Sequence, residues 1–328
     1  MYADNPGFGT RTPNELAAMA LMAETAFRNI PIDNSFSNFA NHPQVLNRIR
    51  RTYGYVPEKP PAELVLEYRL LRWVKDGLST IRLTEDLSAA LALTDVNDVP
   101  FEDWKWPLST FVIHVPYGFW VTNTPLGKDS VAMILATKSL SSDGGLMGQQ
   151  IMFGRDGSAT FSQVPLEGFD TIGDWLDAVV EINRDQTSIS DTYELDATDQ
   201  QNMNEGWKLV VNTCLYMTER RGVHVVKHTT KSARKRADKK GLSTGGPDVW
   251  ILGQEVKLDR RVIEAAKTRA IGGPAWRVNA QFVVHGHWRN QAYGPGYSLH
   301  REKFIEPYFK GQGKRFAHIY DPSDDNEE

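Results

Sequence analysis

Hydrophobic periodicity divides the chain into a helical first part and a strand-rich middle. Over the first 95 residues, apolar positions recur every three or four residues, as they do in amphipathic helices. The sequence Thr12-Pro13-Asn14-Glu15 has the form of a capping box with proline at the first helical position, so a helix is predicted to begin there. Further helices are predicted from Pro43 to Gly54, after Pro61, and more weakly through 87–93.

Short apolar runs replace this period from about Pro100 onward. The runs at 151–153 and 159–161 flank Arg155-Asp156-Gly157, and Asp-Gly between apolar runs is a strong hairpin signal. An antiparallel sheet with two following helices, around 172–182 and 200–218, is therefore expected. Its strands are predicted at 111–115, 119–121, 131–135, 151–153 and 159–161.

The remaining chain is expected to hold a short strand at 249–252, a helix at 260–268 and a β-hairpin with strands at 277–289 and 299–308. We find no internal repeat. The fold class predicted from these patterns is α+β, in five consecutive parts. They are a helical N-terminal region (1–98), an antiparallel sheet with two helices (99–230), a basic linker or loop (231–247), a C-terminal α/β region with the hairpin (248–320) and an acidic disordered tail (321–328).

Composition fits a soluble globular protein, because 41% of the 328 residues are hydrophobic and 24% are charged. No apolar run approaches the length of a membrane span, and the first 16 residues lack the basic and apolar regions of a secretory signal. Cys214 is the only cysteine, which excludes an intramolecular disulfide and a zinc site with several thiolates. We expect a cytoplasmic protein without a membrane partner, with Cys214 buried as a small hydrophobe.

Charge is distributed unevenly along the chain. Residues 1–200 carry 15 basic and 27 acidic residues, whereas residues 201–320 carry 22 basic and 9 acidic ones. A basic half favours a polyanionic partner, most simply nucleic acid. Alternatively, the acidic half folds against the basic half and cancels its field.

The segment 281–291, QFVVHGHWRNQ, carries the most distinctive side chains. Alternate residues of a strand share a face, so His285, His287, Arg289 and Gln291 are predicted to point one way and Trp288 the other. The second strand adds His300, Arg301 and Lys303. The predicted nucleic-acid contacts are His285, His287, Trp288, Arg289, Gln291, Arg301 and Lys303.

Four interpretations of this hairpin remain open. His-x-His could present two imidazoles to a metal, but no further ligand is evident and no metal site is predicted. Histidine acid–base catalysis on RNA, by His285 or His287 beside Arg289, would make the protein a metal-independent ribonuclease. A third interpretation is an RNA-binding surface, on which the cations neutralise phosphates while Tyr293, Tyr297 or Tyr308 stacks on bases. In the fourth, the polar residues only fix the loop and dock the hairpin.

A run of basic residues at 231–240, KSARKRADKK, is interpreted either as a solvated loop or as an arm that orders on contact with phosphates. Its candidate contacts are Lys231, Arg234, Lys235 and Arg236. The chain has no Gly-rich phosphate loop, dinucleotide fingerprint or hydrolase motif, so no cofactor is predicted. His42 and His114 stand alone and are interpreted as structural. These observations favour a binding or regulatory protein over an enzyme.

The C-terminal pattern resembles the second family of type V-A anti-CRISPR proteins, with their phage and plasmid relatives. The similarity lies in Gly286-His287-Trp288-Arg289, the glycine- and tyrosine-rich loop, Ile305-Glu306-Pro307-Tyr308 and Gly311. Tyr117-Gly118-Phe119-Trp120, the helix at 210–218, the basic stretch and 249–253 occur in the expected order, so the resemblance spans about residues 100–320. The chain departs from the family in having Val284-His285 where a basic pair is expected.

The resemblance implies an inhibitor of a host defence protein. It implies that the protein recognises the nascent chain of a CRISPR effector nuclease and promotes translation-dependent loss of the effector mRNA. Such an activity requires one contact with the effector and another with mRNA, the ribosome or a host ribonuclease. Besides this regulator and the ribonuclease, a third possible function is that of a purely protein-binding module without a nucleic-acid partner.

Overall fold

The structure, a computed structural model, has the α+β class that the sequence predicts. Four helices form the N-terminal part: α1 (Pro13–Ala26), α2 (Phe36–Ala40), α3 (Pro43–Tyr53) and α4 (Ala62–Lys75). The described residues are 13–27, 29–32, 36–57, 61–124, 127–141, 144–155, 159–186, 197–219, 224–227, 248–270, 282–284 and 286–310.

The predicted helix starts at Pro13 and at Pro43 are confirmed, and the helix predicted to open at Pro61 begins at Ala62, with Pro61 as its N-cap. Gly54 ends α3 as predicted, with the left-handed φ of 79° that favours glycine. His42 has a structural role, because its Nδ1 accepts a hydrogen bond from the Gln44 backbone N–H and caps α3. Thr12 of the predicted capping box, the 231–247 segment and the acidic tail lie outside the described residues.

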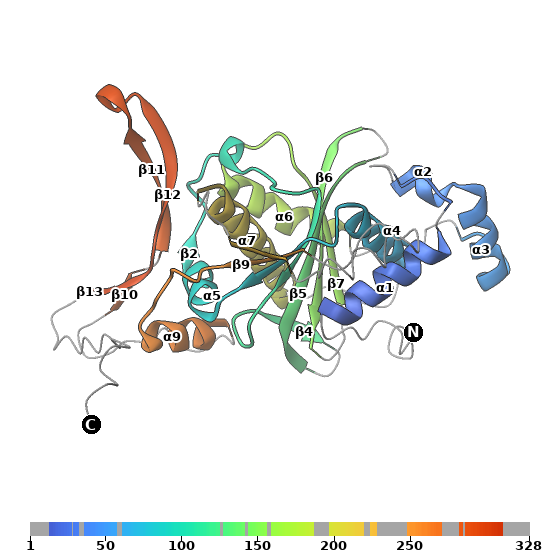
Figure 1. Ribbon diagram of the computed structural model, residues 1–328, viewed down its shortest axis with the longest axis horizontal. Coiled ribbons are helices and arrows are strands. Elements are labelled where there is room, and N and C mark those ends of the chain that lie inside the picture. Colours follow the sequence, from blue (N-terminus) through green and yellow to red (C-terminus); the bar gives the residue numbers. More distant parts are fainter. Residues whose placement is uncertain are drawn as a thin grey trace.

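An eight-stranded mixed sheet forms the centre of the protein (Figure 1). Its order is β7-β6-β5-β3-β1-β9-β8. The remaining strand, β4, lies outside this order and pairs with the first residues of β5. The strands are β1 (Thr80–Leu83), β3 (Thr110–His114), β4 (Val121–Thr124), β5 (Gly127–Leu140), β6 (Leu146–Gly154), β7 (Ala159–Pro165), β8 (His224–Lys227) and β9 (Asp248–Leu252).

The middle-block strands β3, β5, β6 and β7 pair antiparallel, as predicted, but β1 was not expected. It lies in the segment that the apolar period marks as helical, and it runs parallel to both β3 and β9. A four-residue strand is too short to show a period of its own. One sheet thus combines strands from the segments 1–98, 99–230 and 248–320.

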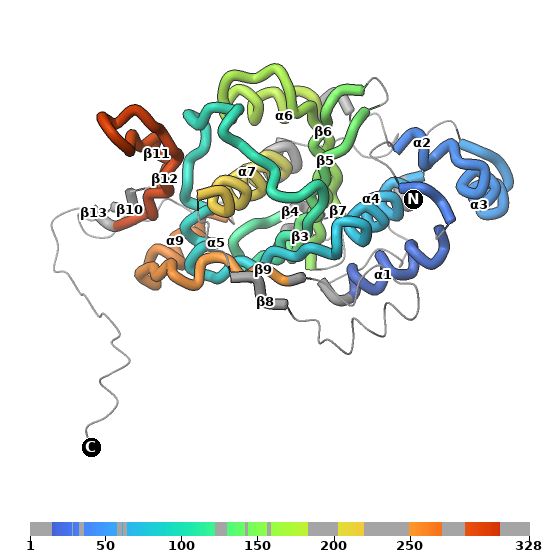
Figure 2. Tube along the Cα trace, turned by 45° about the horizontal axis from the view of Figure 1, so that its top comes forward, coloured from blue at the N-terminus to red at the C-terminus, as the bar shows by residue number. Residues whose placement is uncertain are grey.

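Helices cover both faces of this sheet. On one face, α5 (Glu85–Ala92), α6 (Ile172–Gln186), α7 (Ala197–Glu219) and α9 (Arg260–Ala270) surround a core that includes Ile81, Ile113 and Trp207. On the other face, α1 and α4 pack on Val112 and Met133. The helices α2 and α3 extend this second layer to one end of the molecule (Figure 2).

The apolar face predicted for the 200–218 helix is buried in α7, and Cys214 lies within it. Burial raises the pKa of the Cys214 thiol to about 12, so the thiol stays protonated and behaves as a small hydrophobe. Among the described residues, no helix is long and apolar enough to cross a lipid bilayer.

The C-terminal strands lie outside the central sheet. They are β10 (Phe282–Val284), β11 (Gly286–Tyr293), β12 (Leu299–Ile305) and β13 (Tyr308–Lys310), with a short 3-10 turn at Pro295–Tyr297. The hairpin of β11 and β12 projects from the body at the end opposite α3 (Figure 1). It is attached through β2 (Thr94–Asp95), which pairs parallel with the start of β11.

A close contact after β9 gives a stability prediction. Gly253 has a φ of 86°, and a Cβ there would lie 2.3 Å from the Cβ of Leu87 and 2.6 Å from the Oγ1 of Thr84. Gly144 has nearly the same φ, 90°, with nothing within 4 Å of the same point. Because overpacking costs about 1–3 kcal/mol, Gly253→Ala should lower the free energy of unfolding by about that much more than Gly144→Ala. Urea denaturation of both variants measures the difference, and equal losses would contradict the packing argument.

Candidate binding site on the C-terminal hairpin

The pairing of β11 with β12 divides the hairpin side chains into two faces. The strands are antiparallel, with register partners running from His287 opposite Ile305 to Tyr293 opposite Leu299. Residues two apart share a face, so Trp288, Asn290 and their partners lie on one side and His287, Arg289 and their partners on the other. The alternation that the sequence predicts along β11 is therefore present.

The inner face fixes the base of the hairpin to α7. Trp288 is only 8% exposed, and its indole N–H donates to Oδ1 of Asn212 at 2.8 Å. The Trp288 ring packs on Phe304 with centroids 5.1 Å apart, and Phe304 meets Tyr216 edge-on at 5.7 Å. Trp288 is grouped with the nucleic-acid contacts in the sequence prediction; the structure places its ring on the enclosed inner face, with its N–H bonded to Asn212.

Gly286 lets β11 approach β2. A Cβ on Gly286 would lie 2.5 Å from Oγ1 of Thr94 and 3.0 Å from the carbonyl oxygen of Ile305. Thr94 itself donates to the carbonyl of Ala90 at the end of α5. The Gly-His-Trp-Arg motif therefore alternates between two positions that build the structure and two that face outward.

The outer face is cationic and partly aromatic. Arg289 lies opposite Lys303, and Gln291 lies opposite Arg301. The Arg301 guanidinium sits 5.1 Å from the centre of the Tyr293 ring, which is 39% exposed. No acid occurs among the eight residues of this face: His287, Arg289, Gln291, Tyr293, Leu299, Arg301, Lys303 and Ile305.

Five of the predicted contact residues are thus brought together: His287, Arg289, Gln291, Arg301 and Lys303. His285 lies outside the described residues, as do the auxiliary contacts Lys231, Arg234, Lys235 and Arg236.

The described residues do not supply a pair of catalytic histidines on this face. His300 lies opposite Ala292 on the other face, where its Nδ1 and the Oδ1 of Asn290 are 3.0 Å apart. Within the described ranges, no group of three or more His, Cys, Asp or Glu residues could hold a metal.

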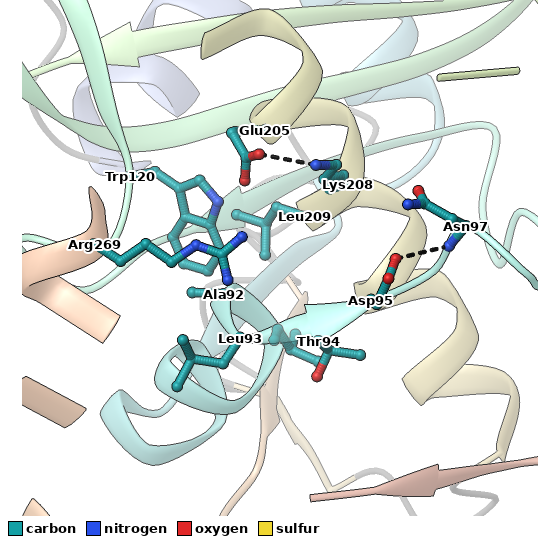
Figure 3. A pocket seen from close by; sticks show the side chains of 11 residues that line it. Ala92, Leu93, Thr94, Asp95, Asn97, Trp120, Glu205, Lys208, Leu209 and Arg269 are labelled. Atoms are coloured by element: carbon teal, nitrogen blue, oxygen red, sulfur yellow. Dashed lines mark hydrogen bonds and ion pairs between the residues drawn. The ribbon is translucent and has the colours of Figure 1, made fainter. Parts of the chain in front are cut away.

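A small cavity of about 130 Å³ opens beside the base of the hairpin (Figure 3). Its apolar lining residues include Leu91, Leu93, Leu209 and Trp120. Its polar residues are Asp95, Asn97, Glu205, Lys208 and Arg269. Asp95 is the register partner of His287, so the cavity and the outer face adjoin at β2.

The charged groups at this cavity differ in their pairing. Glu205 and Lys208 form an ion pair at 2.9 Å, and Asp95 accepts a hydrogen bond from the Asn97 backbone N–H. Arg269 extends from α9 toward Trp120, and within the described part of the chain it has no ion-pair partner (Figure 3). No sequence motif marks this cavity, because its residues come from four separate segments that only the fold brings together.

Comparison with known proteins gives one family. The AcrVA2-like family, described as "Anti-CRISPR type V subtype A2 family", matches residues 81–310. A solved structure described as "Crystal structure of AcrVA2" is similar over 90% of this chain and 93% of that chain, with 13% identity and a TM-score of 0.45. No curated protein matches the chain.

The division between the two hairpin faces can be tested by stability. Trp288→Phe keeps a buried ring but leaves the Asn212 side chain without its donor, and an unsatisfied buried polar group costs about 1–3 kcal/mol. Arg289→Ala removes an exposed side chain and should change the free energy of unfolding by no more than about 0.5 kcal/mol. Chemical denaturation compares the two variants, and a larger loss for Arg289→Ala would contradict the assignment of faces.

Proposed function

Because the family match covers more than half of its length, this chain belongs to the anti-CRISPR type V subtype A2 family, and we propose that it lowers the production of a CRISPR effector nuclease. An anti-CRISPR inhibitor role follows from the family. The proposed mechanism is recognition of the nascent effector in the bacterial cell and loss of the effector mRNA during translation. The observation that carries this proposal is the cationic outer face of the projecting hairpin, whose eight residues include no acid and which Asp95 of β2 borders at its base.

The hairpin face is the proposed contact with mRNA or ribosomal RNA. Arg289, Lys303 and Arg301 can neutralise phosphates, and the Tyr293 ring beside Arg301 offers a surface on which a base can stack. The hairpin stands away from the body, so a long polymer can reach this face without meeting the helices (Figure 1). Binding through such a face should weaken as salt rises, because it releases counterions.

The cavity at the hairpin base is the proposed contact with the effector. Its lining is mainly polar, so it suits a polar or charged side chain of a peptide segment. Arg269 is suited to pair with an acidic residue of that segment. The adjacency of cavity and hairpin at β2 would hold the nascent chain and the RNA close to each other.

The first test separates RNA contact from folding. The double charge reversal Arg289→Glu with Arg301→Glu should reduce RNA binding at least tenfold and abolish loss of effector mRNA, with the thermal midpoint nearly unchanged. The matched control reverses two exposed arginines at the far end of the molecule, Arg50→Glu with Arg51→Glu. Equal RNA binding in wild type and hairpin variant would refute the RNA contact, and a large fall in midpoint would support a docking role for these residues.

The second test addresses the effector contact. Arg269→Glu should prevent co-purification with the effector segment while leaving RNA binding intact, because the side chain belongs to the cavity and not to the outer face. Arg260→Glu, an exposed charge reversal on the same helix, is the control. If both variants retain the effector, the cavity is not its binding site.

The complete activity is tested by co-expression with tagged CRISPR effectors while each effector's mRNA and protein are followed. Selective loss of one mRNA that requires its translation would support the mechanism. Loss of protein with unchanged mRNA would indicate a purely protein-binding inhibitor. RNA cleavage by the purified protein in chelator, lost in His287→Ala, would replace the binding mechanism by a ribonuclease.

A further inference from the structure

Three basic side chains gather at the carboxyl end of β3, away from the hairpin. Arg82 of β1 and His114 of β3 are register partners in a parallel pair. Ile81 and Ile113 belong to the core under α5 and α7, so Arg82 and His114 point to the opposite face of the sheet. In open α/β sheets, ligands bind beyond the carboxyl ends of parallel strands.

Arg155 reaches this place from the end of β6. Its backbone N–H donates to the carbonyl of Ser130 in β5, which holds the start of the side chain. Its Nη2 donates to the carbonyl oxygen of Val115 at 3.3 Å, directly after His114. The guanidinium therefore crosses the end of β5 and lies beside β3.

The cluster has no compensating acid in the part of the chain that the structure describes. None of the three residues has an ion-pair partner there. Burial, followed by the charges of Arg82 and Arg155, lowers the pKa of His114 from 6.5 to about 4. The residue of β5 in register with His114, Met133, is uncharged. The Arg155 guanidinium is partly buried without an anionic partner among the described residues, and a bound anion would stabilise its charge.

Two polar atoms of the cluster are left unsatisfied. Nδ1 of His114 and Nε of Arg155 are buried and have no hydrogen-bond partner among the described residues. Buried donors and acceptors are normally paired, so such atoms need an explanation. Contact with a ligand at the exposed side of the cluster, with a small shift of these side chains, would provide one.

An exposed aromatic ring completes the arrangement. Tyr117 is 69% exposed, and the Arg155 guanidinium lies 5.4 Å from the centre of its ring. The loop that carries Tyr117 is held by a hydrogen bond from the Gly118 backbone N–H to Oγ of Ser130 at 3.0 Å. A base could stack on this ring while its phosphate meets the cations.

We propose that Arg82, His114 and Arg155 bind a phosphate group of a nucleotide, with Tyr117 beside them as a platform for its base. Two guanidinium groups favour phosphate because they donate several charge-assisted hydrogen bonds in a planar geometry. The phosphate can come from a free nucleotide or from RNA, which share this chemistry. The site is separate from the hairpin face, and its occupation does not depend on the function proposed above.

Ligand-dependent stability of the full chain tests the site. Inorganic phosphate, AMP and a short RNA are added separately, and the thermal midpoint should rise with at least one of them. Arg82→Gln should reduce that affinity at least tenfold, and Arg82 is the preferred variant because it is exposed and makes no hydrogen bond within the described residues. Arg260→Gln is the control. Tyr117→Ala should weaken the binding of AMP more than the binding of inorganic phosphate, because only AMP has a base to stack on the ring.

The source of the phosphate follows from competition. Displacement of AMP by RNA would identify RNA, whereas AMP binding that RNA leaves unchanged would identify a free nucleotide. The proposal is overturned if none of the three ligands shifts the midpoint, or if the shift persists in the Arg82→Gln and Arg155→Gln variants. Because RNA bound to the hairpin would also raise the midpoint, the RNA measurements are made on the Arg289→Glu/Arg301→Glu variant, and the two proposals then fail separately.

The titration of His114 gives an independent readout. Because its folded-state pKa lies below its ordinary value, protonation favours the unfolded chain, and this group removes stability as the pH falls from about 6.5 to about 4. His114→Gln should lessen the loss of stability over that interval. In wild type, a bound phosphate should raise the pKa of His114, measured by NMR of the labelled imidazole. An unchanged pKa in the presence of saturating AMP would contradict contact with the phosphate.

Discussion

The parallel pairing of β1 with β3 on one side and β9 on the other is the constraint on which the rest of the structure depends. It joins segments about 30 and 170 residues apart in sequence into one sheet. The chain then enters α5 directly, and Thr84 binds the backbone at Leu252 and Gly253 on the neighbouring strand. Since β2 follows α5, this same pairing also places the edge to which the hairpin attaches.

The hairpin shows how one short motif serves two purposes. Strand alternation directs Gly286 toward β2 and Trp288 toward α7. A side chain at Gly286 would collide with Thr94, and the buried indole N–H of Trp288 is satisfied by Asn212. The residues that alternate with them, His287 and Arg289, face outward. The inner residues hold the base of the hairpin rigidly on the body, and this rigidity positions the cations of the outer face. A binding surface on a projecting hairpin requires such an anchor.

The uneven charge of the sequence is partly cancelled in the fold and partly concentrated. Lys267 from the basic half contacts Glu85 from the acidic half, and Asp86 accepts a hydrogen bond from the Leu258 backbone N–H. The outer hairpin face keeps its positive charge because the only acid on β12, Glu302, lies on the opposite face. Arg82 and Arg155 show that positive charge also gathers within the acidic half. The expectation that the acidic half folds against the basic half therefore describes the contacts of Lys267 and Asp86, and a polyanionic partner stays a prediction.

The sequence by itself determined the features that depend on local geometry. Proline and glycine set the ends of α3, the apolar stripe of α7 buries Cys214, and the period of two along β11 separates Arg289 from Trp288. Only the tertiary structure decided the strand β1, the enclosure of Trp288 by α7, the cavity around Arg269 and the cluster at His114. The physical reason is the sequence separation over which each interaction acts: periodicity and turn chemistry depend on residues that are close neighbours in the sequence. The pairing of distant segments depends on which buried surfaces fit together, and no local pattern records that.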